Sequence, residues 1–265
     1  MALLKNKVFI RDNKWYGCRR DVRDPRDHRF LALPMALPPS VDLRPDCPEV
    51  MDQDARGSCV AHGVIGSMRY LLVMKGGPRD HHLSRLQLYY DAREIEGTSK
   101  EDSGCEIRDA IKCAAKIGVA HESRWPYKIR KFDAKPPANV YVDALKFRAL
   151  EYQRVDVSTF AVRTALAQKH PVIIGLSLFE SFESLAVSRT GMVPMPNLSR
   201  EQMIGGHCMY VVGYGQRDGH FTVRNSWNTD WGDKGDCYMP EQMLGSPDYG
   251  SDYWIVQAAG IASGT

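Results

Sequence analysis

The hydrophobic pattern of this chain changes its period once, near residue 150. From Cys59 onward the apolar residues follow a helical stripe that ends at a Gly-Gly-Pro stretch, and two further helices are expected at 84–90 and 107–117. Beyond residue 150, a short helix at 158–169 precedes short apolar runs typical of strands. The expected strands are residues 171–178, 208–215, 220–227 and 235–240. A helical lobe followed by an antiparallel β lobe predicts the α+β class, with a crevice between the lobes where binding sites tend to lie.

The composition is that of an ordinary globular protein. The 265 residues are 43% hydrophobic and 25% charged, which excludes a disordered chain. The net charge of +3 is spread over stretches of mixed sign, so neither a nucleic-acid groove nor a membrane-surface patch is indicated. No apolar run approaches the roughly 20 residues of a membrane span, and Lys5 and Lys7 interrupt the region where a signal peptide would be apolar. We therefore expect a cytoplasmic protein, with export by another route left open.

An extended arm precedes the main body of the chain. Residues 11–30 alternate arginine and aspartate around Trp15, Tyr16 and Phe30, with neither a helical nor a strand period. The proline-rich stretch at 31–40 favours extended geometry and is typical of a linker. The predicted division is an arm at 1–36 and a main domain at 37–265, with the helical lobe at roughly 50–150 and the β lobe at roughly 151–265.

Cys59 stands where the first helix is expected to begin. A helix N-terminus lowers the pKa of a thiol, because its unpaired N–H groups and its dipole favour the thiolate. Buried inert cysteines are common, however, so Cys59 taken alone would be interpreted as structural. An imidazole from elsewhere in the fold would complete its activation by holding a proton and later delivering it to a leaving group.

Four other residues supply the partners that a nucleophilic cysteine needs. His207 follows two glycines and directly precedes an expected strand, so it would lie at a strand edge. Asn225 can accept the second imidazole N–H and so select the tautomer, with Trp227 shielding that bond from water. Gln53 and the backbone N–H of Cys59 would together donate to the oxyanion that forms on an attacked carbonyl. With these partners, the catalytic interpretation of Cys59 replaces the structural one.

In this order the residues resemble the papain-like cysteine proteases, family C1, from about Leu37 to Trp254. The resemblance is carried by four blocks, LPPSVDLRP, DQDARGSC, GGHCMYVVGYG and NSWNTDWGDKGDCYM. The histidine and the asparagine follow the cysteine at about the spacing of the family signature, roughly 130–150 residues. In length and in its short arm the chain is similar to the bacterial branch of the family. The resemblance implies a two-lobed papain-like fold, with a helical lobe, an antiparallel β-barrel lobe and the active-site cleft between them.

The resemblance also implies the roles of the catalytic residues. Cys59, His207 and Asn225 would form the triad, and Gln53 would hold the oxyanion. Peptide bonds would be hydrolysed through a covalent acyl-enzyme, with no metal and no organic cofactor. The partners would be a peptide or protein substrate and, in the cleft, the chain's own arm.

The substrate-binding residues follow from the same resemblance. Gly104 and Cys105 fall where the family's glycine pair binds an extended peptide backbone. Trp231 would overhang the leaving-group side. Gly206, beside the histidine, would line an uncrowded pocket wall.

The chain departs from the family pattern at several positions. Arg56 stands where the family has a cysteine, and Val60 stands where it has an aromatic residue. Tyr89 and Tyr90 occupy the region that would anchor another family disulfide, so we expect the usual crosslinks to be missing. Cys105 adds a side chain beside the substrate and leaves the substrate preference open.

Two interpretations of the arm stay open. It is either a solvated tail of mixed charge, or a propeptide-like segment that docks across the crevice and hinders substrate access. Its position directly before the mature-like start favours docking and predicts a zymogen. Cys18 and Cys47 are each free, or they pair with each other and tie the arm down. Cys113, Cys208 and Cys237 are expected to pack in the core.

The other histidines do not suggest a metal site. His62, His81 and His82 lack a second pair of ligands that would complete a tetrahedron, so we expect them at the surface. A cysteine peptidase is therefore the predicted function. The alternatives are a papain-fold acyl or amide transferase, in which an amine replaces water, and a papain-shaped binding protein that has lost catalysis.

Overall fold

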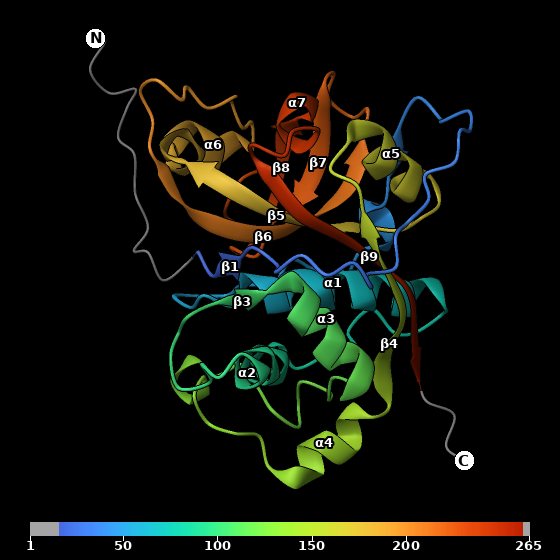
Figure 1. The fold of residues 1–265 in the computed structure, drawn as a ribbon, viewed down its shortest axis with the longest axis vertical. Coiled ribbons are helices and arrows are strands. Elements are labelled where there is room, and N and C mark those ends of the chain that lie inside the picture. The colour runs from blue at the N-terminus through green and yellow to red at the C-terminus, as the bar shows by residue number, and fades with distance from the viewer. Residues whose placement is uncertain (1–15, 262–265) are drawn as a thin grey trace.

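The helical stripe that starts at Cys59 forms α1 (Cys59–Met74), a helix of 16 residues. The computed structural model describes residues 16–261, with side chains described up to residue 259. Every residue of α1 from Cys59 to Leu72 is buried, because the helix packs against the sheet on one side and against two other helices on the other. In Figure 1 it crosses the middle of the molecule.

Three more helices lie where the sequence predicts them. They are α2 (Arg85–Ile95), α3 (Ile107–Lys116) and α5 (Thr159–Ala167). Ser84 caps α2 by accepting a hydrogen bond from the Gln87 N–H, and Ser158 caps α5 in the same way. Gly118 ends the turn after α3 with a φ of 85°, and a side chain there would collide with the Ala144 carbonyl. The sequence analysis did not predict three short helices, α4 (Ala138–Ala144), α6 (Leu185–Thr190) and α7 (Glu241–Leu244).

A seven-stranded sheet has the hydrogen-bonded order β4-β9-β5-β6-β7-β8, with the short β2 from the first half of the chain paired to β6. Its strands are β2 (Val41–Asp42), β4 (Phe147–Val155), β5 (Val172–Phe179), β6 (Met203–Tyr214), β7 (His220–Arg224), β8 (Asp236–Pro240) and β9 (Gly250–Ile261). All these pairs are antiparallel. The α+β class is confirmed.

The four predicted strands correspond to β5, β6, β7 and β8, whereas β4 and β9 were not predicted. Two bounds differ from the prediction near the candidate site. Because β6 already begins at Met203, His207 lies inside a strand and the expected position at a strand edge is wrong. Because β7 ends at Arg224, Asn225 follows the strand.

The expectation of a closed β-barrel is wrong, because the sheet is open. Other segments occupy its two edges. The Phe30 N–H donates to the Arg154 carbonyl on β4 at 2.8 Å, and the Arg154 N–H donates to the His28 carbonyl at 2.7 Å. On β8, the Val193 N–H donates to the Tyr238 carbonyl at 3.0 Å. Because loop segments already bond to the two edge strands, β4 and β8, these strands do not pair with each other and the sheet does not close.

The first described residues run between the sheet and the helices (Figure 1). There β1 (Cys18–Arg19) pairs in parallel with β3 (Cys105–Glu106), with Cys18 opposite Cys105. The arm is extended as predicted, and Trp15 lies outside the described residues. The lobe boundary predicted at 150 falls inside β4, which starts at Phe147. Within residues 16–261, no helix combines the length and the apolar character that crossing a bilayer requires.

Candidate active site

Cys59 is the first residue of α1, and its side chain is fully buried. The backbone N–H groups of Val60 in the first turn of the helix, of Cys208 on β6 and of Gly17 in the arm favour the thiolate and so lower the pKa of its thiol. Burial, with the neighbouring Cys18 thiol, nevertheless raises the pKa of Cys59 to about 12. The expected lowering of this pKa is therefore wrong for the structure with the arm in place, because desolvation outweighs the N–H groups.

His207 and Asn225 meet directly, as the sequence predicts. His207 lies on β6 and Asn225 directly follows β7, and the His207 Nε2 donates to the Asn225 Oδ1 at 2.8 Å. Since an amide oxygen only accepts, this bond places the proton of a neutral imidazole on Nε2. The Asn225 oxygen also accepts the Ser226 N–H at 2.8 Å, which holds the amide in that orientation. Both side chains are buried.

Aromatic rings cover the histidine. The Trp227 ring lies 4.9 Å from the His207 ring, centroid to centroid, and is inclined to it by 37°. Trp231 packs edge-on against Trp227 at 5.2 Å, and Phe182 contacts both indoles. Trp231 and Trp227 also line a surface depression of about 430 Å³.

Gln53 is fully buried and is tied to the asparagine block. Its Oε1 accepts the Ser226 hydroxyl at 2.6 Å, and its backbone N–H donates to the Ser226 carbonyl at 2.9 Å. Its Nε2 donates to the Arg56 carbonyl at 2.7 Å. Gln53 thus connects the loop before Cys59 to the residue that follows Asn225.

The predicted substrate-binding residues lie against the arm. The Cys105 N–H donates to the Gly17 carbonyl at 2.9 Å. A Cβ added at Gly104 would lie 2.0 Å from that same carbonyl oxygen, and one added at Gly206 would lie 2.2 Å from the Cys18 carbonyl oxygen. The glycines therefore provide backbone surfaces that an extended chain can approach closely.

The arm also contacts the histidine side of the site. The Tyr16 ring lies 6.1 Å from the His207 ring and 6.3 Å from the Trp227 ring, edge-on to both. Its hydroxyl donates to Glu183. Gly17 is so close to the loop before Cys59 that an added Cβ would lie 1.8 Å from the Gly57 carbonyl oxygen.

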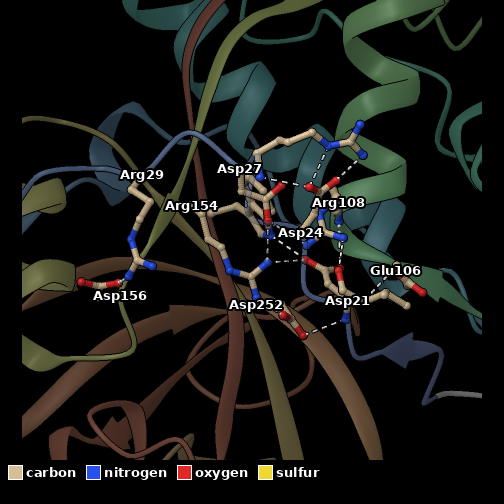
Figure 2. A network of polar contacts seen from close by, with 12 residues as sticks. Asp21, Asp24, Asp27, Arg29, Glu106, Arg108, Arg154, Asp156 and Asp252 are labelled. Carbon is tan, nitrogen blue, oxygen red and sulfur yellow. Dashed lines mark hydrogen bonds and ion pairs between the residues drawn. The ribbon is translucent and has the colours of Figure 1, made fainter.

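A buried charge network anchors the next part of the arm (Figure 2). The Asp21 carboxylate accepts from the Trp254 indole at 2.8 Å, from the Arg154 guanidinium at 3.1 Å and from the Arg108 backbone N–H at 3.1 Å. The Asp21 N–H donates to the Asp252 carboxylate at 3.0 Å. Arg154 on β4 and Arg108 on α3 thus join the arm to both halves of the molecule. In the sequence these residues lie far apart, and Asp21 is only one of several charged residues in a stretch of mixed sign.

Asp102, which sequence reasoning did not use, holds the loop before Cys59. The Asp102 carboxylate accepts from the Gly57 N–H at 3.1 Å, from the Arg56 guanidinium at 3.2 Å and from the Tyr89 hydroxyl at 2.5 Å. Arg56 also lies over the Phe132 ring, 4.4 Å from its centroid. An ion pair therefore stands at the position where the family pattern has a cysteine. The substitution of that cysteine by Arg56 was the feature of the sequence from which this ion pair could have been predicted.

The expected surface position of His62 is wrong. His62 is 1% exposed, because α1 is covered on all sides, and its Nδ1 donates to the Ser58 carbonyl at 2.9 Å. Burial lowers its pKa to about 3, so the ring is neutral. His81 and His82 are half-buried.

Of the two alternatives for Cys18 and Cys47, free thiols or a disulfide between them, the structure has the free thiols. All seven cysteines are unpaired, and Cys47 lies beside Arg224 and Asp236, away from the arm. The pairing of Cys18 with Cys47 is therefore not formed. Cys113, Cys208 and Cys237 are buried, as predicted.

Comparisons with known proteins agree with this arrangement. Residues 37–245 match the family described as papain family cysteine protease. Xylellain, a cysteine protease from Xylella fastidiosa, superposes with a TM-score of 0.84 at 31% identity, over 93% of this chain and 97% of xylellain. A procathepsin B from Trypanosoma congolense superposes with a TM-score of 0.75 at 18% identity, over 94% of this chain and 88% of that one, and shares the fold.

Two sequence relatives extend the comparison. An uncharacterized peptidase C1-like protein of Acanthamoeba polyphaga mimivirus is 35% identical over 237 residues, which cover 86% of this chain and 72% of that protein. Cathepsin S of Bos taurus is 30% identical over 221 residues, which cover 80% of this chain and 62% of the cathepsin. The matched residues include the whole candidate site, and the chain belongs to the papain family of cysteine proteases.

Proposed function

We propose that the protein hydrolyses peptide bonds with Cys59 as nucleophile, His207 as acid and base, Asn225 as the residue that orients the imidazole, and Gln53 in the oxyanion hole. The observation that carries the proposal is the 2.8 Å bond between His207 Nε2 and Asn225 Oδ1. The backbone N–H of Cys208, the residue after His207, is among the groups that favour the thiolate of Cys59. The family membership supports the same chemistry.

The reaction would take place in two halves. The Cys59 sulfur attacks the scissile carbonyl, while the Cys59 N–H and the Gln53 amide hold the oxyanion. His207 protonates the departing amine and then accepts a proton from the water that releases the acyl group. Asn225 stabilises the imidazolium by keeping the Nε2 proton engaged, and Trp227 keeps water away from that bond.

We propose further that the arm restrains the enzyme as a zymogen. The contacts of Tyr16 with His207 and of Gly17 with Cys59 and Cys105 support this role. A peptide substrate needs the same Cys105 N–H and the same sulfur, and therefore competes with the arm.

The catalytic assignment is tested with an electrophilic epoxide probe and a fluorogenic peptide library. Wild type should be labelled at Cys59 and should cleave peptides, whereas Cys59→Ala should do neither. Cys113→Ser, which changes a buried thiol on α3, is the matched control and should keep both activities. Absence of labelling and of hydrolysis under reducing conditions in both wild type and Gly17→Ala, in which the arm is displaced, would instead support an inert binding protein.

The restraint by the arm is tested with Gly17→Ala. The added methyl group would collide with the Gly57 carbonyl and so displace the arm, while the main domain is unchanged. Overpacking of this kind costs about 2 kcal/mol, which corresponds to roughly a thirtyfold larger population of the open state. Peptide hydrolysis should therefore rise about thirtyfold at low substrate concentration. Val22→Ala, at an arm side chain that is 71% exposed, should leave the rate unchanged. Equal rates for Gly17→Ala and wild type would exclude inhibition by the arm.

A further inference from the structure

Four cysteine side chains meet where the arm passes the candidate nucleophile. Cys59, Cys105 and Cys208 belong to the main domain and are buried, and Cys18 belongs to the arm. The Cys208 thiol neighbours those of Cys59 and Cys105, and the Cys105 thiol neighbours those of Cys59 and Cys18. The proposed mechanism uses the sulfur of Cys59 alone, so the other three thiols have no assigned role.

Cys18 lies over the face of the sheet that carries Cys208. Cys208 on β6 lies directly opposite Gly175 on β5, so the two residues share one face of the sheet, and Gly206, two residues before Cys208, shares it too. A Cβ added at Gly175 would lie 3.3 Å from the Cys18 sulfur, and one added at Gly206 would lie 3.9 Å from the Cys18 Cβ. The arm thiol therefore occupies the space that these two glycines leave beside Cys208.

We propose that Cys18 and Cys208 form a redox latch, in which a disulfide between them fastens the arm over Cys59 and its reduction frees the arm. The inference rests on the proposed restraint by the arm. Among the neighbouring thiols, Cys208 is assigned as the partner because the Cys18 sulfur lies at Gly175, the residue directly opposite Cys208 on the same face of the sheet. The disulfide would bring the two sulfurs to about 2.05 Å.

The oxidant we assign is a small anionic disulfide of the glutathione disulfide class. The Cys18 thiolate attacks one of its sulfurs, which forms a mixed disulfide and releases the first glutathione as a thiolate. The Cys208 thiolate then attacks the Cys18 sulfur, which forms the protein disulfide and releases the second glutathione. The two protein thiols lose two electrons and two protons; glutathione disulfide accepts the electrons as its S–S bond breaks, and the two glutathione thiolates so formed take up the protons.

The surroundings of Cys18 suit such an oxidant. Cys18 lines an open pocket of about 310 Å³ together with Arg19, Arg20 and Met203. Arg20 places a positive charge at this pocket, and glutathione disulfide is an anion. Arg19 is paired with Glu96, and the carboxylates of Asp21 and Asp252 near the thiol help to raise the pKa of Cys18. The contact with Cys208 and burial raise the pKa of Cys18, and burial raises that of Cys208, so the exchange should be faster at pH 8.5 than at pH 7.

The first experiment maps the crosslink in the full-length protein. After incubation with glutathione disulfide, wild type should lose two hydrogens by intact mass, and peptide mapping should find Cys18 linked to Cys208. Cys47→Ser should form the same crosslink, whereas Cys18→Ser and Cys208→Ser should not form it. A linkage of Cys18 to Cys47, Cys59 or Cys105 in wild type, or a glutathione adduct alone, would overturn the assignment. Because the mapping is done on wild type, this outcome does not depend on how the variants fold.

The second experiment measures whether the crosslink fastens the arm. The epoxide probe should label Cys59 at least about tenfold more slowly in the oxidised than in the reduced wild type, since labelling requires local opening. Dithiothreitol should restore the reduced rate, and Cys18→Ser should give equal rates under both conditions. Unchanged labelling of the crosslinked protein would refute the latch. Failure of the proposed peptidase would look different, because even reduced Gly17→Ala would then show neither labelling nor hydrolysis, whatever the crosslink mapping found.

Discussion

At the scale of single residues, burial decides the state of the nucleophile. The position of Cys59 at the start of α1 was predictable from the helical stripe, and the N–H groups around its sulfur do favour a thiolate. Burial removes the water that the charge also needs, and this desolvation raises the pKa of Cys59. Under the proposed restraint, docking of the arm would favour the protonated thiol as well as block the approach of a substrate.

The pH dependence of Cys59 alkylation follows from this coupling. With the arm docked the pKa of Cys59 is about 12, so both opening and deprotonation are needed and the rate should rise about tenfold per pH unit from pH 6 to 9.5. In Gly17→Ala the sulfur is hydrated, and the rate should level off within this range. Iodoacetamide labelling followed by intact mass provides both profiles. Parallel profiles that differ only by a constant factor would contradict the coupling.

At the scale of elements, a polar junction replaces a covalent one. Asp102 joins the Arg56–Gly57 loop before α1 to Tyr89 on α2 through three hydrogen bonds. The loop therefore keeps the geometry that presents Cys59 without a disulfide. The sequence revealed the missing cysteine, but its replacement depends on residues that meet only in the folded chain.

Removing this junction should weaken both the fold and the site. Asp102→Ala leaves the Gly57 N–H and the Arg56 guanidinium without their acceptor, which we expect to cost about 2–3 kcal/mol of unfolding free energy. Urea unfolding followed by tryptophan fluorescence measures the loss. Asp218→Asn, at an exposed position, is the matched control and should change stability by less than about 0.5 kcal/mol. Equal stability of Asp102→Ala and wild type would show that the junction contributes nothing.

At the scale of the whole molecule, the arm fastens the two halves together. Asp21 contacts Arg108 on the helical side and Arg154, Asp252 and Trp254 on the sheet side. Burial and the neighbouring Asp252 raise the pKa of Asp21 from 3.8 to about 6, while the hydrogen bonds from Arg108 and Trp254 and the charge of Arg154 oppose the shift. The Asp21 carboxyl in the network of Figure 2 therefore binds a proton more tightly than a carboxyl in water does.

The sign of the pH effect follows from that direction. Because the pKa of Asp21 is higher in the folded than in the unfolded chain, its contribution to stability is largest below about pH 4 and is lost as the pH rises through about 6. Asp21→Asn removes this titration. The thermal stability of wild type relative to Asp21→Asn should therefore increase when the pH falls from 7.5 to 4.5. A difference that decreases over this range would contradict the assignment.

Sequence reasoning succeeded where a signal is local or where a pattern has one chemical meaning. The helix at Cys59 and the strands at 172–179 and 208–214 follow from hydrophobic period, and the pairing of His207 with Asn225 follows from complementary donors and acceptors. It failed for the barrel, for the surface position of His62 and for the thiol pKa of Cys59. Each of these depends on what other segments cover: the edges of the sheet, the outer face of α1 and the sulfur itself.

By itself the sequence determined the order of helices and strands and the set of groups able to carry out thiol chemistry, because period and side-chain type are properties of the chain alone. The tertiary structure alone decided which backbone lies against which sulfur. Burial, and with it charge state and access, is produced by segments distant in sequence. For that reason the bond between Gly17 and Cys105 and the position of Cys18 over the sheet face of Cys208 became visible only in the folded protein.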